Sequence, residues 1–228
     1  MRRNVIVPLL FGIIGVAILV SLGVWQVQRL QWKNRILSDI ETRIAAEPVT
    51  LPDAPDPESD KYLPVVVEGD FTGEGIRVLV SLKQVGAGYR YISVMETETG
   101  RILVDRGFAR TDAEGGPEAS RDVRITGNLH WPDEVDGYTP EPDLEAGIWF
   151  ARDVPRMAAH LETRPVLVIA SKTSETDPFA TPLRLDSAGI PNDHLEYAIT
   201  WFSLAAIWAG MTGFFLWRTR RPAEGKKT

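Results

Sequence analysis

Two segments of the chain combine aromatic side chains with polar groups that could bind an iron porphyrin. They run from Gly23 to Lys33 and from Asn192 to Phe202. At helical spacing the key side chains of each segment share one face. They are Trp25, Arg29 and Trp32 in the first segment, and His194, Tyr197 and Trp201 in the second, with Trp208 farther along the same face. A neutral imidazole can ligate haem iron, aromatic rings can flank the macrocycle, and a guanidinium can pair with a propionate. The residue types therefore suggest a tetrapyrrole site, provided that the two segments meet.

The same residues also have a simpler explanation. Trp and Tyr form belts at membrane–water interfaces, and Lys and Arg extend their charged ends toward the headgroups there. His194 could be only a polar residue in the first turn of a helix. The residue pattern by itself leaves both explanations open.

Each segment borders an apolar stretch that is long enough to cross a bilayer. No charged residue occurs from Val5 to Val24 or from Ala198 to Trp217, and about 20 helical residues span roughly 30 Å of hydrocarbon. The first stretch is longer than the apolar core of a signal peptide, about 7–15 residues, and no A-x-A cleavage site follows it. We therefore expect uncleaved transmembrane helices at residues 5–24 and 198–217, which places both aromatic segments at one membrane surface.

The charges outside these stretches predict the orientation in the membrane. Arg2 and Arg3 precede the first stretch, and the tail after the second is basic, whereas the region between them is acidic. By the positive-inside rule, residues 1–4 and 218–228 are cytoplasmic and residues 25–197 are periplasmic. Without a long transit peptide before the first stretch, we expect a multi-pass protein of a bacterial plasma (inner) membrane. No basic patch indicates a nucleic-acid partner.

The region between the two stretches is predicted to form a helix followed by a β-rich domain. Helix formers continue over residues 25–46, prolines break the pattern at 48–57, and the domain covers about residues 62–186. Strands are expected at 62–71, 76–82, 89–98, 101–108, 123–131, 148–152, 165–170 and 182–185, and a short helix capped by Asp153 at 153–161. The expected fold class is an α+β membrane protein, in which N- and C-terminal transmembrane helices flank an antiparallel β-rich extramembrane domain with a short helix.

The extramembrane region carries no recognisable catalytic motif. The chain has no cysteine, which excludes thiol chemistry, and no nucleophile elbow, phosphate-binding loop or metalloprotease motif occurs. His130 and His160 lack the spacing of metal ligands. Asp105 and Arg106 are expected to form an ion pair at the end of a strand, and three loop carboxylates are expected to be solvated: Asp133, Glu134 and Asp136. We therefore expect a protein that is not an enzyme.

Four motifs in order give the chain a family resemblance over nearly its whole length. They are GxWQxxRxxWK from Gly23, YxPVxVxGxF from Tyr62, ILVDRGF from Ile102 and NxHLxYAITWF from Asn192. With them the chain resembles the Surfeit locus protein one family, membrane-bound assembly factors of haem-copper cytochrome c oxidase. The resemblance implies a function in inserting haem A into oxidase subunit I. Subunit I, haem A synthase and membrane lipid are therefore the expected partners.

The resemblance also implies roles for individual residues. His194 matches the proposed iron ligand of the family and Tyr197 its tyrosine. To these the residue pattern adds Trp201, Trp25, Arg29 and Trp32 as residues that contact haem A, bound as transient cargo. The alternative function is a cofactor-free membrane scaffold that stabilises assembly intermediates of the oxidase.

Three positions depart from the family pattern. Glu196 replaces a usual Gln, Asp105 replaces a usual Asn, and Leu63 stands where Arg is common. Glu196 would place a negative charge beside an anionic ligand, unless its side chain lies on the far face of its helix.

Overall fold

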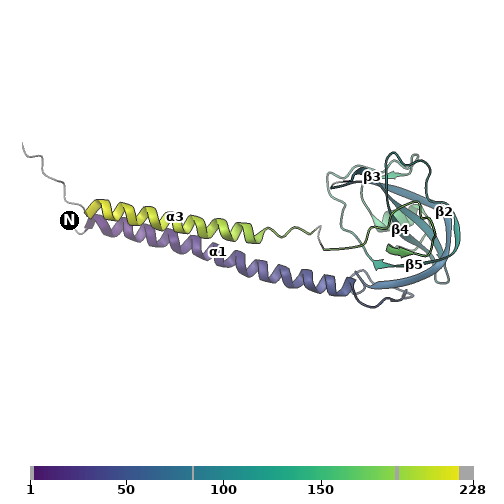
Figure 1. Cartoon of the computed structure of the whole chain (residues 1–228), viewed down its shortest axis with the longest axis horizontal. Helices are drawn as coiled ribbons and strands as arrows, with labels where there is room; N and C mark the ends of the chain where they lie inside the picture. Colours follow the sequence, from purple (N-terminus) through teal and green to yellow (C-terminus); the bar gives the residue numbers. More distant parts are fainter. Residues whose placement is uncertain (1–2, 84, 188–189, 221–228) are drawn as a thin grey trace, which may run out of the picture. The chain divides into compact units, whose positions relative to one another are not determined.

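The computed structural model describes residues 3–83, 85–187 and 190–220, which belong to two compact units. The helical unit comprises the described residues of 1–39 and 188–228, and the β unit comprises those of 40–187. Helix α1 (Arg3–Ile44) and helix α3 (His194–Arg220) build the helical unit, and the last turn of α1 belongs to the β unit (Figure 1).

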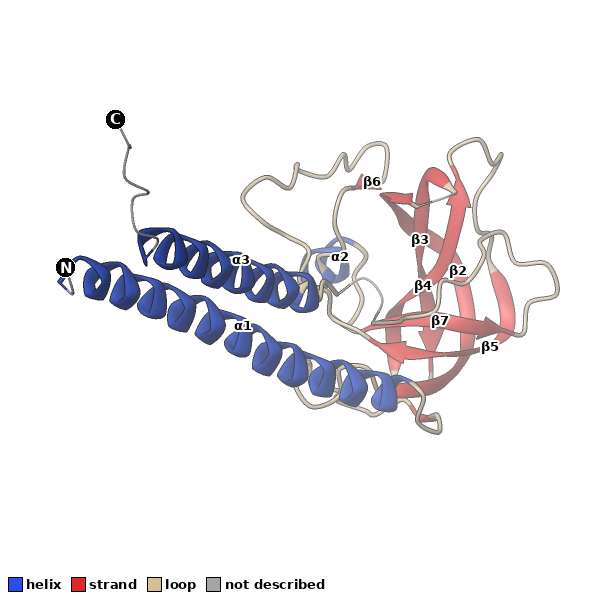
Figure 2. Cartoon of the chain, turned by 60° about the vertical axis from the view of Figure 1, so that its left-hand side comes forward, coloured by secondary structure: helices blue, strands red, loops and turns tan. Residues whose placement is uncertain are grey.

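In the helical unit α1 and α3 lie side by side and antiparallel (Figure 2). The rings of Phe11 and Trp208 are 5.5 Å apart at one end of the pair, and Gln26 contacts His194 at the other. Both helices are long and apolar enough to cross a membrane. Because the helices are antiparallel, the Arg3 end of α1 and the Arg220 end of α3 lie at the same end of the pair.

Glycines allow the two helices to approach closely. A Cβ atom on Gly15 would lie 2.4 Å from Nε1 of Trp208, and one on Gly23 would lie 2.8 Å from the ring of Phe202. Small residues at such contacts are typical of helix pairs in membranes, where packing rather than the hydrophobic effect drives association.

The β unit is a small closed barrel. Strand β2 pairs with β3, β3 with β4, β4 with β7, β7 with β5, and β5 pairs back with β2. Short strands β1 and β6 also pair with β2, each in parallel, and helix α2 covers part of the barrel. The bounds are β1 (Val49–Thr50), β2 (Pro64–Leu82), β3 (Gly86–Thr97), β4 (Gly100–Arg110), β5 (Ser120–Leu129), β6 (Ile148–Trp149), α2 (Val154–His160) and β7 (Leu167–Thr173).

Alternation along the strands creates two cores, one on each face of the sheet. In β4, Ile102 and Val104 point into the barrel, whereas Leu103 packs outside it with Met157 of α2. All four side chains are fully buried. Asp153 accepts a hydrogen bond from the backbone N–H of Arg156 and so caps α2 as expected.

The predicted fold class is confirmed, with three differences in the sheet. The strands expected at 62–71 and 76–82 are one strand, β2, with an irregularity between Phe71 and Gly75 that lets it pair with β5 and then with β3. The pairing of β4 with β7 is parallel, so the sheet is not purely antiparallel. The strand expected at 182–185 is absent, and only Thr181 forms a bridge there, with Phe108.

Asp105 and Arg106 do not pair with each other, because neighbouring residues of a strand point to opposite faces. Asp105 is fully buried and contacts Nε of Arg90 at 2.6 Å and a guanidinium nitrogen of Arg152 at 3.6 Å. Arg106 binds Glu175 at 2.6 Å on the other face. The expected ion pair is therefore wrong, although each residue is paired.

Three loop carboxylates, Asp133, Glu134 and Asp136, are exposed as expected, and two of them also have partners. Glu134 forms an ion pair with the largely buried Arg152, and Asp136 accepts hydrogen bonds from the backbone of Tyr138 and the hydroxyl of Thr139. These contacts order a long loop that has no regular secondary structure.

Candidate functional site

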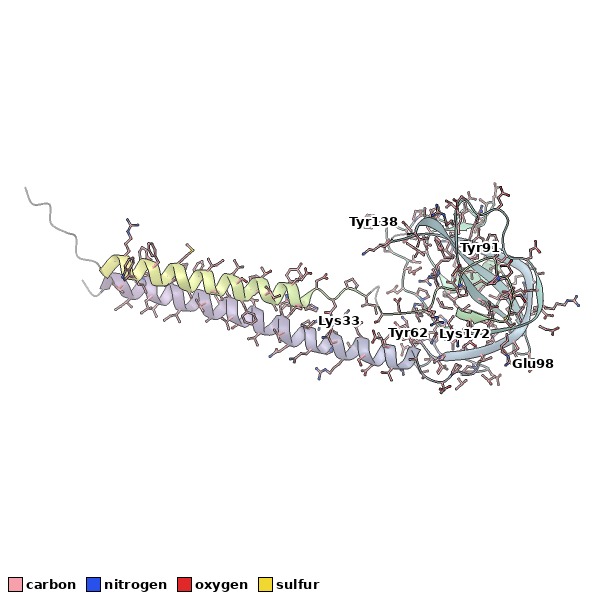
Figure 3. The ribbon with its side chains drawn as sticks, viewed as in Figure 1. Lys33, Tyr62, Tyr91, Glu98, Tyr138 and Lys172 are labelled. Carbon is pink, nitrogen blue, oxygen red and sulfur yellow. The ribbon has the colours of Figure 1, made fainter. Side chains whose placement is uncertain are left out.

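The two aromatic segments meet at one end of the helix pair. Nδ1 of His194, the first residue of α3, lies 2.8 Å from Oε1 of Gln26 on α1. Asn192 donates a hydrogen bond of 2.8 Å to Oδ1 of Asn34, close to Lys33, which Figure 3 labels on α1. The juxtaposition on which a two-helix site depends is therefore present.

The contact with Gln26 orients the imidazole of His194. A carboxamide oxygen can only accept, so this contact favours the tautomer of a neutral imidazole in which Nδ1 carries the proton and Nε2 has a free lone pair. Nε2 makes no hydrogen bond to any residue that the structure describes. Histidine ligands of metals are commonly oriented in this way by a second hydrogen bond. Gln26 is 8% exposed and His194 is half-buried, which fits a ligand held at the edge of the helix pair.

On α1 the three predicted residues lie beside the helix contact rather than in it. At about 100° per residue, Trp25, Arg29 and Trp32 point about 60–120° to one side of Gln26. The guanidinium of Arg29 lies 3.8 Å from the centre of the Trp32 ring, and Trp25 is 54% exposed. This face is therefore open to a ligand.

On α3, Tyr197 points about 60° to one side of His194 and is 56% exposed. Two antiparallel helices that face each other are related by a rotation about an axis perpendicular to both. Offsets in the same angular sense from Gln26 and from His194 therefore lie on the same side of the pair. We call this side the motif flank and define it by four residues: Trp25, Arg29, Trp32 and Tyr197.

The remaining candidates of α3 take different places. Trp201 is half-buried, within about 20° of the direction of His194. Trp208 packs against Phe11 with tilted rings and covers Gly15, about 21 Å along the helix from His194, so it serves helix packing. Glu196 points about 200° from His194, away from α1, and is exposed. The negative charge of Glu196 is therefore directed away from α1, about 100° from the direction of Tyr197.

Gln26 is the site residue that the sequence analysis missed. It belongs to the motif that begins at Gly23, but it lies off the face that Trp25, Arg29 and Trp32 share. A usable signal was present, because Gln26 lies seven residues after Leu19 and therefore continues an apolar stripe with a polar residue.

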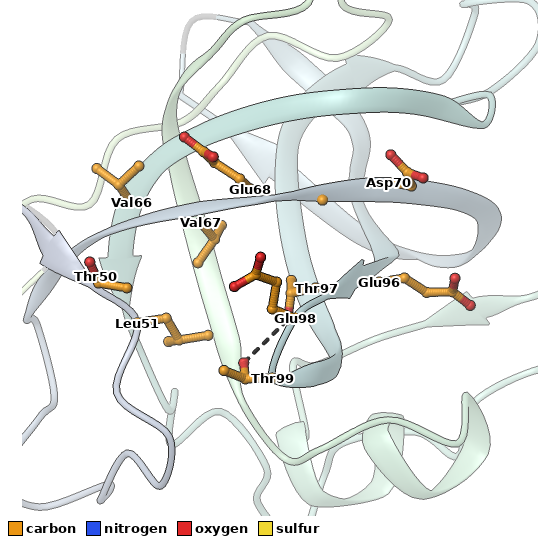
Figure 4. A pocket seen from close by; sticks show the side chains of 11 residues that line it. Thr50, Leu51, Val66, Val67, Glu68, Asp70, Glu96, Thr97, Glu98 and Thr99 are labelled. Carbon is orange, nitrogen blue, oxygen red and sulfur yellow. Dashed lines mark hydrogen bonds between the residues drawn. The ribbon is translucent and has the colours of Figure 1, made fainter.

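The β unit contains a cavity of about 550 Å³ between β1, β2 and the β3–β4 hairpin (Figure 4). Its rim carries Glu68, Asp70, Glu96 and Glu98. Glu68 is paired with Arg124, and Asp70 accepts a hydrogen bond from the backbone of Asp122. Among the described residues no group of three or more His, Cys, Asp or Glu side chains could hold a metal ion. This cavity therefore offers less chemistry than the helix pair.

Known proteins resemble the chain over most of its length. The SURF1 family profile matches residues 13–206. Surfeit locus protein 1 of Rattus norvegicus is 29% identical over 82% of this chain and 68% of its own length. A SURF1-like protein of Monosiga brevicollis is 30% identical over 85% and 82%, and one of Rickettsia felis is 28% identical over 90% and 92%. The match covers both aromatic segments and the barrel between them, and the chain belongs to the SURF1 family.

Proposed function

We propose that this protein binds haem A at the motif flank and delivers it to subunit I of a haem-copper cytochrome c oxidase. Membership of the SURF1 family implies a role in the assembly of this oxidase. Binding and delivery of haem A go beyond family membership, and they rest on the residues of the helix pair.

The observation that carries the proposal is the contact of His194 with Gln26. It directs the proton to Nδ1 and leaves Nε2 as a ligand for iron. Tyr197, Trp201 and Trp25 would contact the macrocycle. Arg29, held against Trp32, would pair with a propionate.

The open flank suits a carrier better than a permanent haem protein. The exposed Trp25 and Tyr197 leave one side of the bound macrocycle accessible, so that a recipient can supply a competing ligand. Haem A is then cargo, and the protein itself catalyses no reaction. The β unit would serve as the docking surface for subunit I and for haem A synthase, on the periplasmic side of a bacterial plasma membrane.

Haem loading tests this function. The protein is co-expressed with the enzymes of haem A synthesis, purified in detergent, and its haem content and Soret spectrum are measured. His194→Ala should lose most of the haem, and Gln26→Leu should weaken binding by about 10- to 100-fold, as loss of a hydrogen bond to a ligand histidine does. His160→Ala in the β unit and Gln31→Leu, which points away from α3 on the side opposite the motif flank, should bind as the wild type does.

Two outcomes would contradict the proposal. An unchanged spectrum and stoichiometry in His194→Ala would remove this histidine from the site. Copurification of haem-free protein with subunit I, unaffected by the absence of haem A, would favour the cofactor-free scaffold.

A further inference from the structure

Apart from the cavity in the β unit, a hollow lies on the helix pair, along its apolar segment. It has a volume of about 360 Å³ and is lined by apolar side chains of both helices: Ile18 and Leu19 of α1, and Leu204, Ile207, Trp208 and Met211 of α3. Gly15 also lines it, and a side chain there would collide with the Trp208 ring. We call this hollow the apolar groove.

The apolar groove opens on the same side of the pair as the motif flank. Relative to Gln26, Ile18 points about 80° toward the side of Trp25, and relative to His194, Leu204 and Met211 point about 80–100° toward the side of Tyr197. Ile18 and Met211 are 56% and 66% exposed, as this direction requires.

Contacts between the helices support this assignment of sides. Phe11 and Trp208, whose rings contact each other, have offsets of about 40–60° toward the motif flank. Gly23 and Phe202, which contact each other, have offsets of about 60–80° toward the opposite side. Each contact thus joins residues that the helical geometry places on the same side.

The groove also begins at a suitable depth. Ile18 precedes Gln26 by eight residues and Leu204 follows His194 by ten, which corresponds to about 12 and 15 Å along the helices. The groove ends near Met211, about 25 Å from His194. A long chain attached to the edge of a macrocycle at the motif flank would therefore enter the groove along the flank.

We propose that the apolar groove holds the farnesyl-derived tail of haem A and makes the protein selective for haems that carry this tail. This inference rests on the proposed function, since it requires the macrocycle to bind at His194. Within a bilayer, lipid chains are as apolar as the tail, so hydrophobicity alone selects neither. Tethering decides the occupant, because a macrocycle bound at His194 gives its own tail a high effective concentration at the groove.

Three haems separate the contribution of the tail from that of the macrocycle. Haem O carries the tail without the formyl group of haem A, and haem B carries neither. The purified full-length protein is titrated with each haem in detergent, and the dissociation constant is taken from the Soret absorbance. We expect the wild type to bind haem O at least about tenfold more tightly than haem B.

Two matched variants assign this preference to the groove. Ile18→Trp fills the groove, whereas Val20→Trp adds the same ring on the opposite side at similar depth. Ile18→Trp should bring the ratio of haem B to haem O dissociation constants to about one, with haem B affinity unchanged. Val20→Trp should keep the wild-type ratio, which also corrects for partition of the tail into detergent.

The outcomes distinguish the two proposals. Equal wild-type affinity for haem O and haem B, or a ratio that persists in Ile18→Trp, would mean that the groove holds only lipid and would overturn the inference. Haem B binding that depends on His194 would leave the proposed function intact in that case. If the wild type binds none of the three haems, both proposals fail.

Discussion

A single hydrogen bond gives His194 the character that its position alone does not provide. Many transmembrane helices begin with a polar or aromatic residue at the interface. Gln26 changes the chemistry of this one, because its carboxamide oxygen accepts a hydrogen bond from Nδ1 and so leaves Nε2 as the nitrogen that can bind a ligand. A variant at Gln26 is therefore as informative as one at His194.

The half-buried His130 of the β unit predicts a pH dependence of stability. Burial, together with the positive charges of Arg152 and Lys61, lowers the pKa of His130 to about 4. Its unfolded pKa is about 6.5, so the unfolded chain binds a proton that the folded barrel excludes. The stability that depends on neutral His130 is complete above pH 6.5 and is lost as the pH falls toward 4.

Denaturation of the full chain in detergent at pH 7.5 and pH 5 checks this prediction. Neutral His130 should account for about 1–2 kcal/mol of the stability lost between these values, after allowance for solvent screening. His130→Gln cannot take up the proton and should lose correspondingly less stability over the same range. Equal losses in both proteins would show that His130 is readily protonated in the folded state.

At the scale of elements, the helix pair depends on the close approach at Gly23. A side chain there would press against Phe202 and separate α1 from α3 near the site. The chain has no cysteine, so the pair Asn34→Cys and Asn192→Cys can report the separation through a short thiol crosslinker.

Gly23→Leu in this background should lower the crosslinking yield about threefold, because helices in a bilayer associate through packing. Arg35→Cys with Asn192→Cys is the control, since Arg35 points away from α3 and should crosslink poorly with or without Gly23→Leu. An unchanged yield in Gly23→Leu would show that the pair is held together by other contacts.

At the scale of the whole molecule, the distribution of charge predicts on which side of the membrane the ends of the helices and the β unit lie. The Arg3 end of α1 and the Arg220 end of α3 should be cytoplasmic, and the acidic β unit should be periplasmic. Cysteines introduced at Glu98, on the β3–β4 hairpin, and at Arg218, near the end of α3, test this with a membrane-impermeant maleimide. In spheroplasts Glu98→Cys should be labelled, and Arg218→Cys should be labelled only after lysis. The reverse pattern would invert the proposed orientation.

Much of this protein could be predicted from its sequence, because the governing signals are local. The two apolar stretches, most of the strands and the cap at Asp153 follow from hydrophobic runs, alternation and side-chain chemistry over a few neighbouring residues. The motif order from Gly23 to Phe202 likewise led to the family. The candidate residues Trp25, Arg29, Trp32, His194 and Tyr197 were identified in the same way.

Tertiary structure alone decided how these parts meet. The closure of the barrel through β2 and β5, the parallel pairing of β4 with β7, and the separate partners of Asp105 and Arg106 depend on contacts between residues far apart in the chain. The same holds for the Gln26–His194 contact and for the apolar groove. Local sequence sets the face on which each residue lies, but the rotation of one helix against the other comes from packing at glycines, which no single segment encodes.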